Sequence, residues 1–226
     1  MFTGSIMVEM DSIGAHDQEA AQYDQQVRDC RSHVHDVLFG LAFEYVKSRE
    51  MLLDLGIGTG LASWPFAKTG LKVYGLDGSA EMLKVCESKE FAEELRQFDL
   101  RNMPLPYFDD SFHHAICCGV FHFFGELGPI ISETSRVMKP GGMFAFTIAS
   151  PTPEEQAASR DNSTGYVMQP TACGVSIYAH SDRYIREALH CVGFEPSKTQ
   201  KILTSSGEEV TDDLLFEVVV ARNSRR

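Results

Sequence analysis

A glycine-rich turn constrains this chain more than any other stretch of its sequence. The heptapeptide Asp54–Gly60 follows the apolar run Met51–Leu53 and leads into a helical pattern that starts at Leu61. Glycine adopts positive φ readily and lets a ligand approach the backbone closely, so the order strand, glycine turn and helix is a typical ligand-binding arrangement. The sequence therefore predicts a ligand site at the carboxyl end of a strand in an α/β sheet.

The spacing of these glycines differs from that of a dinucleotide-binding turn. That fingerprint reads G-x-G-x-x-G/A and uses its last small residue for close packing of helix on strand. Counting from Gly56 puts Leu61 at this place, and counting from Gly58 puts Ser63 there. The carboxylate of Asp54, just ahead of the turn, disfavours a pyrophosphate and favours a cationic ligand. S-adenosylmethionine, which carries a sulfonium and an ammonium group, meets this requirement.

The turn and the segments after it match one family in chain order. Asp54–Gly60 resembles motif I of the class I S-adenosylmethionine-dependent methyltransferases. Leu71–Asp77 is typical of a second strand that ends in an acid, and Gly78–Leu83 opens a helix for which Ser79 is a candidate N-cap. Gln97–Leu100 looks like the adenine-edge segment of this family. The resemblance thus extends over the whole predicted cofactor-binding region.

Two later segments extend the resemblance and predict the fold. Leu105–Phe112 resembles the segment that precedes the family's fourth strand, although His113 stands where an Asp is usual. Glu133–Gly142 matches the family's E-x-x-R-V-L-K-P-G-G nearly residue for residue, and the matches together cover Met51–Ile148. Strands and helices alternate over this range. We therefore expect an α/β fold: a Rossmann-like, doubly wound, seven-stranded sheet, mostly parallel, with a C-terminal antiparallel hairpin.

The chain is expected to form one methyltransferase domain over residues 1–226, since its length suits a single α/β domain. Its predicted parts are an N-terminal helical cap (1–48), the cofactor-binding core (51–148), a substrate-cover insertion (150–177) and a C-terminal helix and hairpin (178–221). The cap should begin with a loose segment, Met1–His16, followed by a helix around Gln18–Cys30 and a longer one that reaches Lys47. Residues 150–177 contain mostly turn-forming types, and a connection of this length is commonly functional or disordered. A plain surface loop is the alternative.

The resemblance also implies which residues hold S-adenosylmethionine. The glycine turn and Asp54 are expected to grip it, and Asp77 to accept hydrogen bonds from both ribose hydroxyls. The Asp99 carboxylate would take the exocyclic adenine amine, and the main-chain N–H of Leu100 would meet a ring nitrogen. No metal is expected. The full cofactor-binding set is Tyr23, Asp54, Gly56, Gly58, Gly60, Asp77, Gly78, Asp99, Leu100 and Cys118.

Methyl transfer leaves few catalytic marks in a sequence, because the enzyme mainly holds the acceptor in line with the breaking bond and needs a base only for some acceptors. His122, after the predicted fourth strand, is a candidate base or substrate-orienting residue, and Tyr23, in a "Y-D" element, is a candidate to close over the cofactor. A structural histidine and a core aromatic residue are the respective alternatives. His180 borders the predicted cover. Four apolar residues are candidates for an apolar pocket or for the core: Phe121, Phe123, Phe124 and Met168.

Charge and composition favour a small-molecule methyl acceptor. The chain has 20 Lys and Arg against 32 Asp and Glu, a formal charge of −12, and scattered basic residues, whereas nucleic-acid binders show a basic patch. No Asn/Asp-Pro-Pro-Tyr loop, which grips flipped bases, follows the fourth strand. Six cysteines without a C-x-x-C pair, no signal peptide and no long apolar run predict a cytoplasmic protein without a membrane partner. Monomer and homodimer both remain open, as does the acceptor atom (O, N, C or S).

Other functions suit the same fold, because a fold alone does not determine function. A non-catalytic S-adenosylmethionine-binding or partner-binding protein is one alternative. A thiol or arsenic methyltransferase is another, and would need Cys30, Cys117 or Cys118, and Cys173 to converge near the methyl group. Aminopropyl transfer would need further acidic residues after the fourth strand, and the sequence shows no such cluster.

Overall fold

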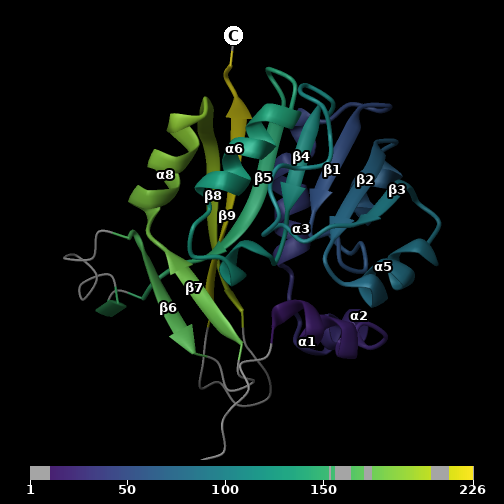
Figure 1. Cartoon of the computed structure of the whole chain (residues 1–226), viewed down its shortest axis with the longest axis horizontal. Helices are drawn as coiled ribbons and strands as arrows, with labels where there is room; N and C mark the ends of the chain where they lie inside the picture. The colour runs from purple at the N-terminus through teal and green to yellow at the C-terminus, as the bar shows by residue number, and fades with distance from the viewer. Residues whose placement is uncertain (1–10, 153, 156–163, 171–174, 205–213, 226) are drawn as a thin grey trace, which may run out of the picture.

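The structure is a computed structural model of the whole chain, and it describes residues 11–152, 154–155, 164–170, 175–204 and 214–225. The strands are β1 Met51–Leu55, β2 Lys72–Asp77, β3 Ala92–Gln97, β4 His114–Cys117, β5 Met143–Ala149, β6 Tyr166–Pro170, β7 Ser176–His180, β8 Phe194–Thr204 and β9 Leu214–Asn223 (Figure 1). The helices are α1 Ser12–Glu19, α2 Tyr23–Asp29, α3 Val34–Ala42, α4 Trp64–Lys68, α5 Ala80–Glu87, α6 Gly128–Val137 and α8 Asp182–Cys191, with the short 3-10 helices η1 Phe43–Tyr45 and η2 Phe121–Phe123.

The strands form one sheet whose order places the glycine turn at its switch point. The path is β3-β2-β1-β4-β5-β7-β6, and β9 pairs with both β5 and β8. Strands β1 to β5 are parallel, whereas β9 is antiparallel to β5 and β8. The strand order turns back between β1 and β4, where open α/β sheets bind ligands at the carboxyl ends of their strands. The predicted fold class, mostly parallel with a C-terminal antiparallel hairpin, is confirmed.

The sheet gains two strands from the segment predicted as the substrate cover. β6 and β7 form an antiparallel hairpin in which Tyr166 pairs with His180, and β7 meets β5 only through Ala149 and Ala179. The described sheet therefore has nine strands where seven were expected. The sequence analysis did not predict these two strands, because the runs that begin at Tyr166 and Ser176 are short and stand between stretches rich in turn residues. Part of the segment lies outside the described residues.

Two hydrophobic cores lie on the two faces of the sheet, because strand side chains alternate in direction. In β5, Phe144 and Phe146 belong to one core, whereas Met143 and Ala145 belong to the other. Residues of α6 and α8 complete the first core, and residues of α3, α4 and α5 complete the second. Figure 1 shows α6 and α8 on the same face of the sheet. The sheet is thus covered on both faces, as expected for a doubly wound fold.

The N-cap residue predicted for α5 is confirmed, whereas the N-terminal helices differ from the helices predicted there. The side chain of Ser79 accepts the main-chain N–H of Met82 at 3.0 Å and caps α5, as predicted. The side chain of Ser181 caps α8 in the same way, by accepting the N–H of Tyr184 at 3.3 Å. The helix expected around residues 18–30 is instead two helices, and the first begins at Ser12, within the segment expected to be loose. The cause is tertiary: α1 packs on α5.

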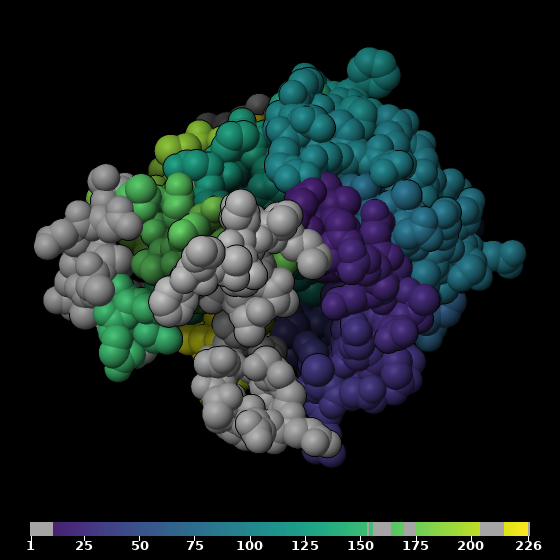
Figure 2. Space-filling view, turned by 60° about the horizontal axis from the view of Figure 1, so that its bottom comes forward, coloured from purple at the N-terminus to yellow at the C-terminus, as the bar shows by residue number. Residues whose placement is uncertain are grey.

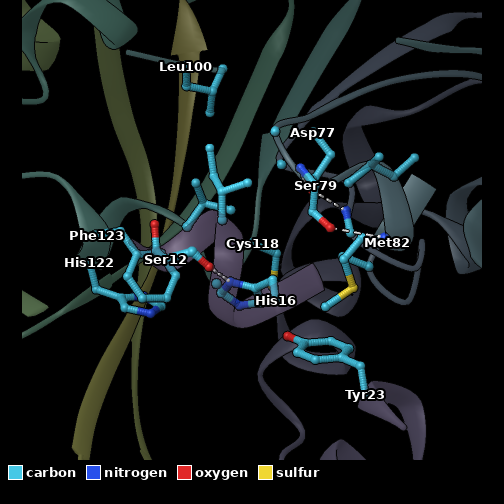
Figure 3. Close-up of a pocket in the computed structure, with 18 of the residues that line it drawn as sticks. Ser12, His16, Tyr23, Asp77, Ser79, Met82, Leu100, Cys118, His122 and Phe123 are labelled. Atoms are coloured by element: carbon cyan, nitrogen blue, oxygen red, sulfur yellow. Dashed lines mark hydrogen bonds between the residues drawn. The ribbon is translucent and has the colours of Figure 1, made fainter. Parts of the chain in front are cut away.

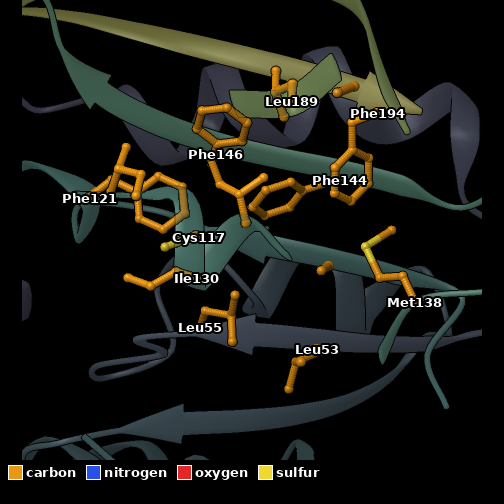
Figure 4. Packing of buried hydrophobic residues seen from close by; sticks show 14 of the residues in the cluster. Leu53, Leu55, Cys117, Phe121, Ile130, Met138, Phe144, Phe146, Leu189 and Phe194 are labelled. Atoms are coloured by element: carbon orange, nitrogen blue, oxygen red, sulfur yellow. The ribbon is translucent and has the colours of Figure 1, made fainter. Parts of the chain in front are cut away.

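Phe144 lies at the centre of the first core (Figure 4). It is fully buried, and its ring centroid lies 4.8 Å from that of Phe146, 5.3 Å from that of Phe194 and 6.2 Å from that of Phe121. Aromatic side chains in such clusters contribute large buried areas and favourable ring contacts.

Truncating Phe144 should therefore destabilise the whole domain. We expect Phe144→Ala to lower the free energy of unfolding by about 3–5 kcal/mol, since it removes a buried ring and leaves a cavity. Urea denaturation followed by circular dichroism measures this loss. The control is Leu203→Ala on β8, where the side chain is 68% exposed, and it should change stability by less than about 0.5 kcal/mol. Equal effects of the two variants would contradict this assignment of the core.

Candidate cofactor and acceptor site

A cavity of about 600 Å³ lies at the carboxyl ends of β1, β2 and β4. Its volume is in the range of small-molecule sites, about 300–1,000 Å³. Residues of the glycine turn, of the segments after β2, β3 and β4, and of α1 and α2 line it. Figure 2 views this end of the molecule and shows the N-terminal helices, in purple, against the blue part of the chain that includes α5. The cavity is therefore built from the sheet and partly covered by the N-terminal helices.

The glycine turn has the geometry that its sequence predicts. Gly56, Gly58 and Gly60 have φ angles of +77°, +54° and +88°. A Cβ at Gly56 would lie 2.3 Å from a side-chain atom of Val120, whereas a Cβ at Gly58 would meet no atom within 4 Å. Gly56 and Gly58 line the cavity, and Gly60 is buried behind them. The open side of the turn, at Gly58, is where a ligand can approach the backbone.

Asp77, at the end of β2, is held by two main-chain hydrogen bonds. Its Oδ2 accepts the N–H of Gly58 at 2.7 Å, and its Oδ1 accepts the N–H of Ser79 at 2.8 Å. Asp77 and Gly78 both line the cavity. Burial raises the pKa of Asp77, while the two main-chain donors act in the opposite direction. Each carboxylate oxygen can accept a second hydrogen bond, so Asp77 retains capacity for two ligand hydroxyls.

Asp54 lies beneath the glycine turn and does not line the cavity. It is 1% exposed; its Oδ2 accepts the hydroxyl of Ser63 at 2.5 Å, and its Oδ1 is buried without a hydrogen-bond partner. Burial raises the pKa of Asp54 to about 7. A cationic group in the cavity would favour the ionised carboxylate, so this buried acid suits the charges of S-adenosylmethionine without touching the cavity.

The segment predicted to bind adenine lies at one end of the cavity. Asp99 and Leu100 both line it. The Asp99 carboxylate accepts the main-chain N–H and the Nε–H of Arg101, each at 2.9 Å, and Arg101 also pairs with Asp11 at 3.0 Å. These bonds lower the pKa of Asp99 against the opposing effect of its partial burial. Asp99 is therefore an ionised acceptor that already has a partner in this structure.

Acidic residues attach the N-terminal helices to the cofactor side of the cavity. In α1, Asp17 accepts the hydroxyl of Ser79 at 2.5 Å. In α2, Asp24 accepts the hydroxyl of Thr59 at 2.5 Å and pairs with Lys89 at 2.6 Å. Because Thr59 belongs to the glycine turn and Ser79 caps α5, the N-terminal helices are attached to the segments that shape the cavity.

Tyr23 and Cys118 both line the cavity (Figure 3). Tyr23 begins α2, beside the attached Asp24, and Cys118 follows the end of β4. Burial raises the pKa of each to about 12, so the phenol and the thiol both stay protonated at neutral pH. The thiol is therefore not a ready nucleophile.

His122 also lines the cavity, from η2 after β4. Its Nδ1 is buried without a hydrogen-bond partner, and burial lowers its pKa to about 3. The imidazole is thus neutral throughout the physiological range and is a weak base. The sequence position of His122 did not reveal this, because it does not show how deeply the ring is buried.

Several other predicted residues lie apart from the cavity. His180 is buried in β7, where its Nε2 lies 3.1 Å from the carbonyl oxygen of Gly125. Phe121 is fully buried in the first core, and Met168 is 57% exposed on β6, whereas Phe123 and Phe124 line the cavity. Of the four candidate apolar residues, two therefore belong to the cavity wall.

The cysteines of the described chain do not form a metal site. Cys30 is exposed at the end of α2, and Cys117 is buried in β4 behind Cys118. Cys173 lies outside the described residues. Within the described ranges, no group of three or more His, Cys, Asp or Glu side chains is arranged to hold a metal ion.

Sequence reasoning missed much of the cavity wall, because no motif marks these residues. They come from α1 to α3, from α5, from β7 and the residue before it, and from β9, and they include Ile13, His16, Val27, Val34, His35, Met82, Val175, Ser176, Tyr178 and Phe216. For His16, the sequence offers only an indirect signal of a place in the site: this histidine lies seven residues before the Tyr23–Asp24 pair.

Comparison with known proteins agrees with this fold. Residues 53–146, less than half of the chain, match a family profile described as a methyltransferase domain. This part of the chain holds the glycine turn, Asp77 and Asp99. The predicted resemblance to the class I S-adenosylmethionine-dependent methyltransferases, whose methyl donor is S-adenosylmethionine, is thus confirmed for this part of the chain.

This chain aligns with only part of the length of its curated relatives, whereas it aligns with most of the length of solved structures. A demethylmenaquinone methyltransferase from Bacillus mycoides is 37% identical over 105 residues, which are 43% of this chain and 44% of that protein. A malonyl-[acyl-carrier protein] O-methyltransferase from Yersinia pestis is 32% identical over 97 residues, 43% of this chain and 36% of that protein. The chain thus spans less than half the length of these curated relatives.

One solved structure of the same fold contains a bound ligand. It is a magnesium protoporphyrin IX methyltransferase from Synechocystis PCC 6803 with bound S-adenosylhomocysteine. The TM-score is 0.61 at 18% identity, over 96% of this chain and 90% of that one. Among the described residues, no helix combines the length and apolar character that a membrane span requires.

Replacing the Asp77 carboxylate should weaken cofactor binding. We expect Asp77→Asn to weaken the binding of S-adenosylhomocysteine by about 1.5–3 kcal/mol in binding free energy, because charge-assisted hydrogen bonds to the ribose hydroxyls are lost. Isothermal titration calorimetry measures this change. The matched control is Glu81→Gln, an exposed acid on the neighbouring helix α5, which should bind as the unaltered protein does. A folded Asp77→Asn variant with full affinity would remove Asp77 from the site.

Binding of S-adenosylmethionine should release protons near neutral pH. The pKa of Asp54 is raised to about 7 in the free protein, so a large fraction is protonated at pH 6.5. A bound cation favours the carboxylate and expels this proton. Calorimetry in buffers of different ionisation enthalpy should show a larger proton release for the unaltered protein than for Asp54→Asn. Equal proton release would show that Asp54 does not sense the ligand.

Proposed function

We propose that this protein is an S-adenosylmethionine-dependent methyltransferase that acts on a small molecule. The observation that carries the proposal is the pairing of Asp77 with the glycine turn: one carboxylate is fixed by main-chain donors at the edge of a cavity whose turn is open at Gly58. S-adenosylmethionine would supply an activated methyl group there. The chain's own contribution is to hold the donor and an acceptor in line, which can account for several kcal/mol of the activation barrier.

The cofactor-binding residues of this proposal are the ten that the sequence predicts. Eight of them line the cavity: Tyr23, Gly56, Gly58, Asp77, Gly78, Asp99, Leu100 and Cys118. Asp54 and Gly60 would act from beneath, through charge and through the shape of the turn. The described residues that line the cavity contain no cluster of lysine and arginine side chains that would bind nucleic acid, so we propose a small-molecule acceptor.

We further propose that residues 150–177 help to enclose the acceptor. Val175 and Ser176, at the start of β7, belong to the cavity wall and support this role. The N-terminal cap would contribute Tyr23 from the opposite side. Lids of this kind exclude water and complete a site when a ligand binds.

The rival function is a protein that binds S-adenosylmethionine without turnover. A thiol or arsenic methyltransferase is less favoured, because Cys30 is exposed away from the cavity and burial keeps the Cys118 thiol protonated. The names of two relatives give their acceptors as malonyl-[acyl-carrier protein] and demethylmenaquinone. We assign neither acceptor to this chain.

Two measurements test the proposal. Calorimetry should show binding of S-adenosylmethionine and S-adenosylhomocysteine and no measurable binding of NAD, whose pyrophosphate would meet the Asp77 carboxylate in the cavity and lie near the buried acid Asp54. Incubation of a metabolite extract with methyl-labelled S-adenosylmethionine should then give a labelled product that mass spectrometry identifies. Binding with no labelled product in any extract would favour the binding-only alternative. Tight NAD binding without S-adenosylhomocysteine binding would overturn the proposal.

A further inference from the structure

We propose that the acceptor is an uncharged aromatic compound with a hydroxyl group, and that His16 receives the hydroxyl proton through its Nε2. This inference rests on the proposed methyl transfer and specifies its acceptor and its base. It is carried by the composition of one wall of the cavity, by the charged residues that line the cavity as a whole and by the hydrogen bond of His16.

The wall opposite Asp77 is aromatic and will be called the acceptor wall. Figure 3 shows His122 and Phe123 on one side of the cavity, Asp77, Ser79 and Met82 on the other, and His16 between them. The residues of the acceptor wall come from η2 and the residue after it, from β7 and from β9: His122, Phe123, Phe124, Tyr178 and Phe216. Flat aromatic ligands pack favourably against such rings.

The charges around the cavity disfavour an anionic acceptor. Among the described residues that line it, Arg101 is the only lysine or arginine, and both Asp99 and Asp11 pair with it. Asp77 adds a third carboxylate to the lining. A carboxylate or phosphate on the acceptor would therefore lose its hydration without gaining a free cationic partner, which is costly. An uncharged acceptor avoids this cost.

His16 has the geometry of an oriented base. Its Nδ1 lies 2.6 Å from the carbonyl oxygen of Ser12, one turn earlier in α1. A carbonyl oxygen can only accept a hydrogen bond, so Nδ1 carries the proton and the neutral ring presents the lone pair of Nε2. The ring is held edge-on to Phe123, with centroids 5.4 Å apart, and 6.1 Å from the ring of Tyr23. Since His16 lines the cavity, a ligand hydroxyl can reach it.

His122 is a poorer base although it follows β4. Its ring is packed between Phe123 and Phe216, with centroids 4.0 and 5.4 Å away. Burial lowers its pKa to about 3. A ring that resists protonation suits a wall for an apolar acceptor better than it suits a proton acceptor.

The proposed step is balanced within the site. The acceptor oxygen donates a lone pair to the methyl carbon, and a new O–C bond forms as the C–S bond breaks. The electrons of the C–S bond stay on sulfur, which leaves as the neutral thioether of S-adenosylhomocysteine. The hydroxyl proton passes to Nε2 of His16, and the imidazolium later returns it to solvent. No oxidant or reductant is needed.

Binding to the protein loaded with S-adenosylhomocysteine tests the inference without turnover. The probes are 2-naphthol, its isostere 2-methylnaphthalene, which lacks the hydroxyl, and the anion 2-naphthoate, all followed by equilibrium dialysis. We expect 2-naphthol to bind about 3- to 10-fold more tightly than 2-methylnaphthalene, because it gains one hydrogen bond. We expect 2-naphthoate to bind at least about tenfold more weakly than 2-naphthol. Tighter binding of the anion, or no binding of any aromatic probe, would overturn the acceptor class.

Matched histidine variants then identify the partner of the hydroxyl. His16→Phe should abolish the preference for 2-naphthol over 2-methylnaphthalene, whereas His122→Phe should retain it. Retention in His16→Phe would overturn the role of His16. Titration with S-adenosylhomocysteine shows whether each variant is folded and retains its cofactor-binding site. If S-adenosylhomocysteine does not bind the unaltered protein, the proposed function itself fails, which is a different outcome from loss of the aromatic preference alone.

Discussion

The carboxylate of Asp77 joins the parts of the structure on which the site depends. It ties the end of β2 to the glycine turn through Gly58 and to the start of α5 through Ser79, with hydrogen bonds of 2.7 and 2.8 Å. The glycines suit this turn, because Gly56, Gly58 and Gly60 all have positive φ, which glycine adopts without strain. The cavity edge is therefore formed by the same bonds that orient Asp77.

The N-terminal helices extend this arrangement across the cavity. Asp17 bonds to Ser79, and Asp24 bonds to Thr59 and Lys89, so α1 and α2 attach to segments that already surround Asp77. This attachment is what brings His16 and Tyr23 into the cavity wall. It also explains why α1 is ordered in a stretch whose own pattern is weak, since tertiary contacts supply most of the stability of a short helix.

Prediction from sequence succeeded where a local pattern has a direct structural cause. The glycine turn, the cap Ser79 and the mostly parallel character of the sheet follow from allowed backbone angles, capping and the alternation of strands and helices along the chain. It was less complete for the segment after β5, where strands beginning at Tyr166 and Ser176 are short and stand between turn-rich stretches. For His122 the position was predicted but the ionisation was not, because pKa depends on burial.

The sequence by itself determined the fold class and the methyl donor, and eight of its ten predicted cofactor-binding residues line the cavity. Most of these lie within a few residues of strand ends that a parallel sheet brings to one edge. Only the tertiary structure decided the acceptor wall. His16 and Phe216 are separated by nearly the whole chain and share no motif, yet docking of α1 and the pairing of β9 with β5 place both at one cavity. The raised pKa of Asp54 and the lowered pKa of His122 likewise arise from burial, which exists only once the chain has packed.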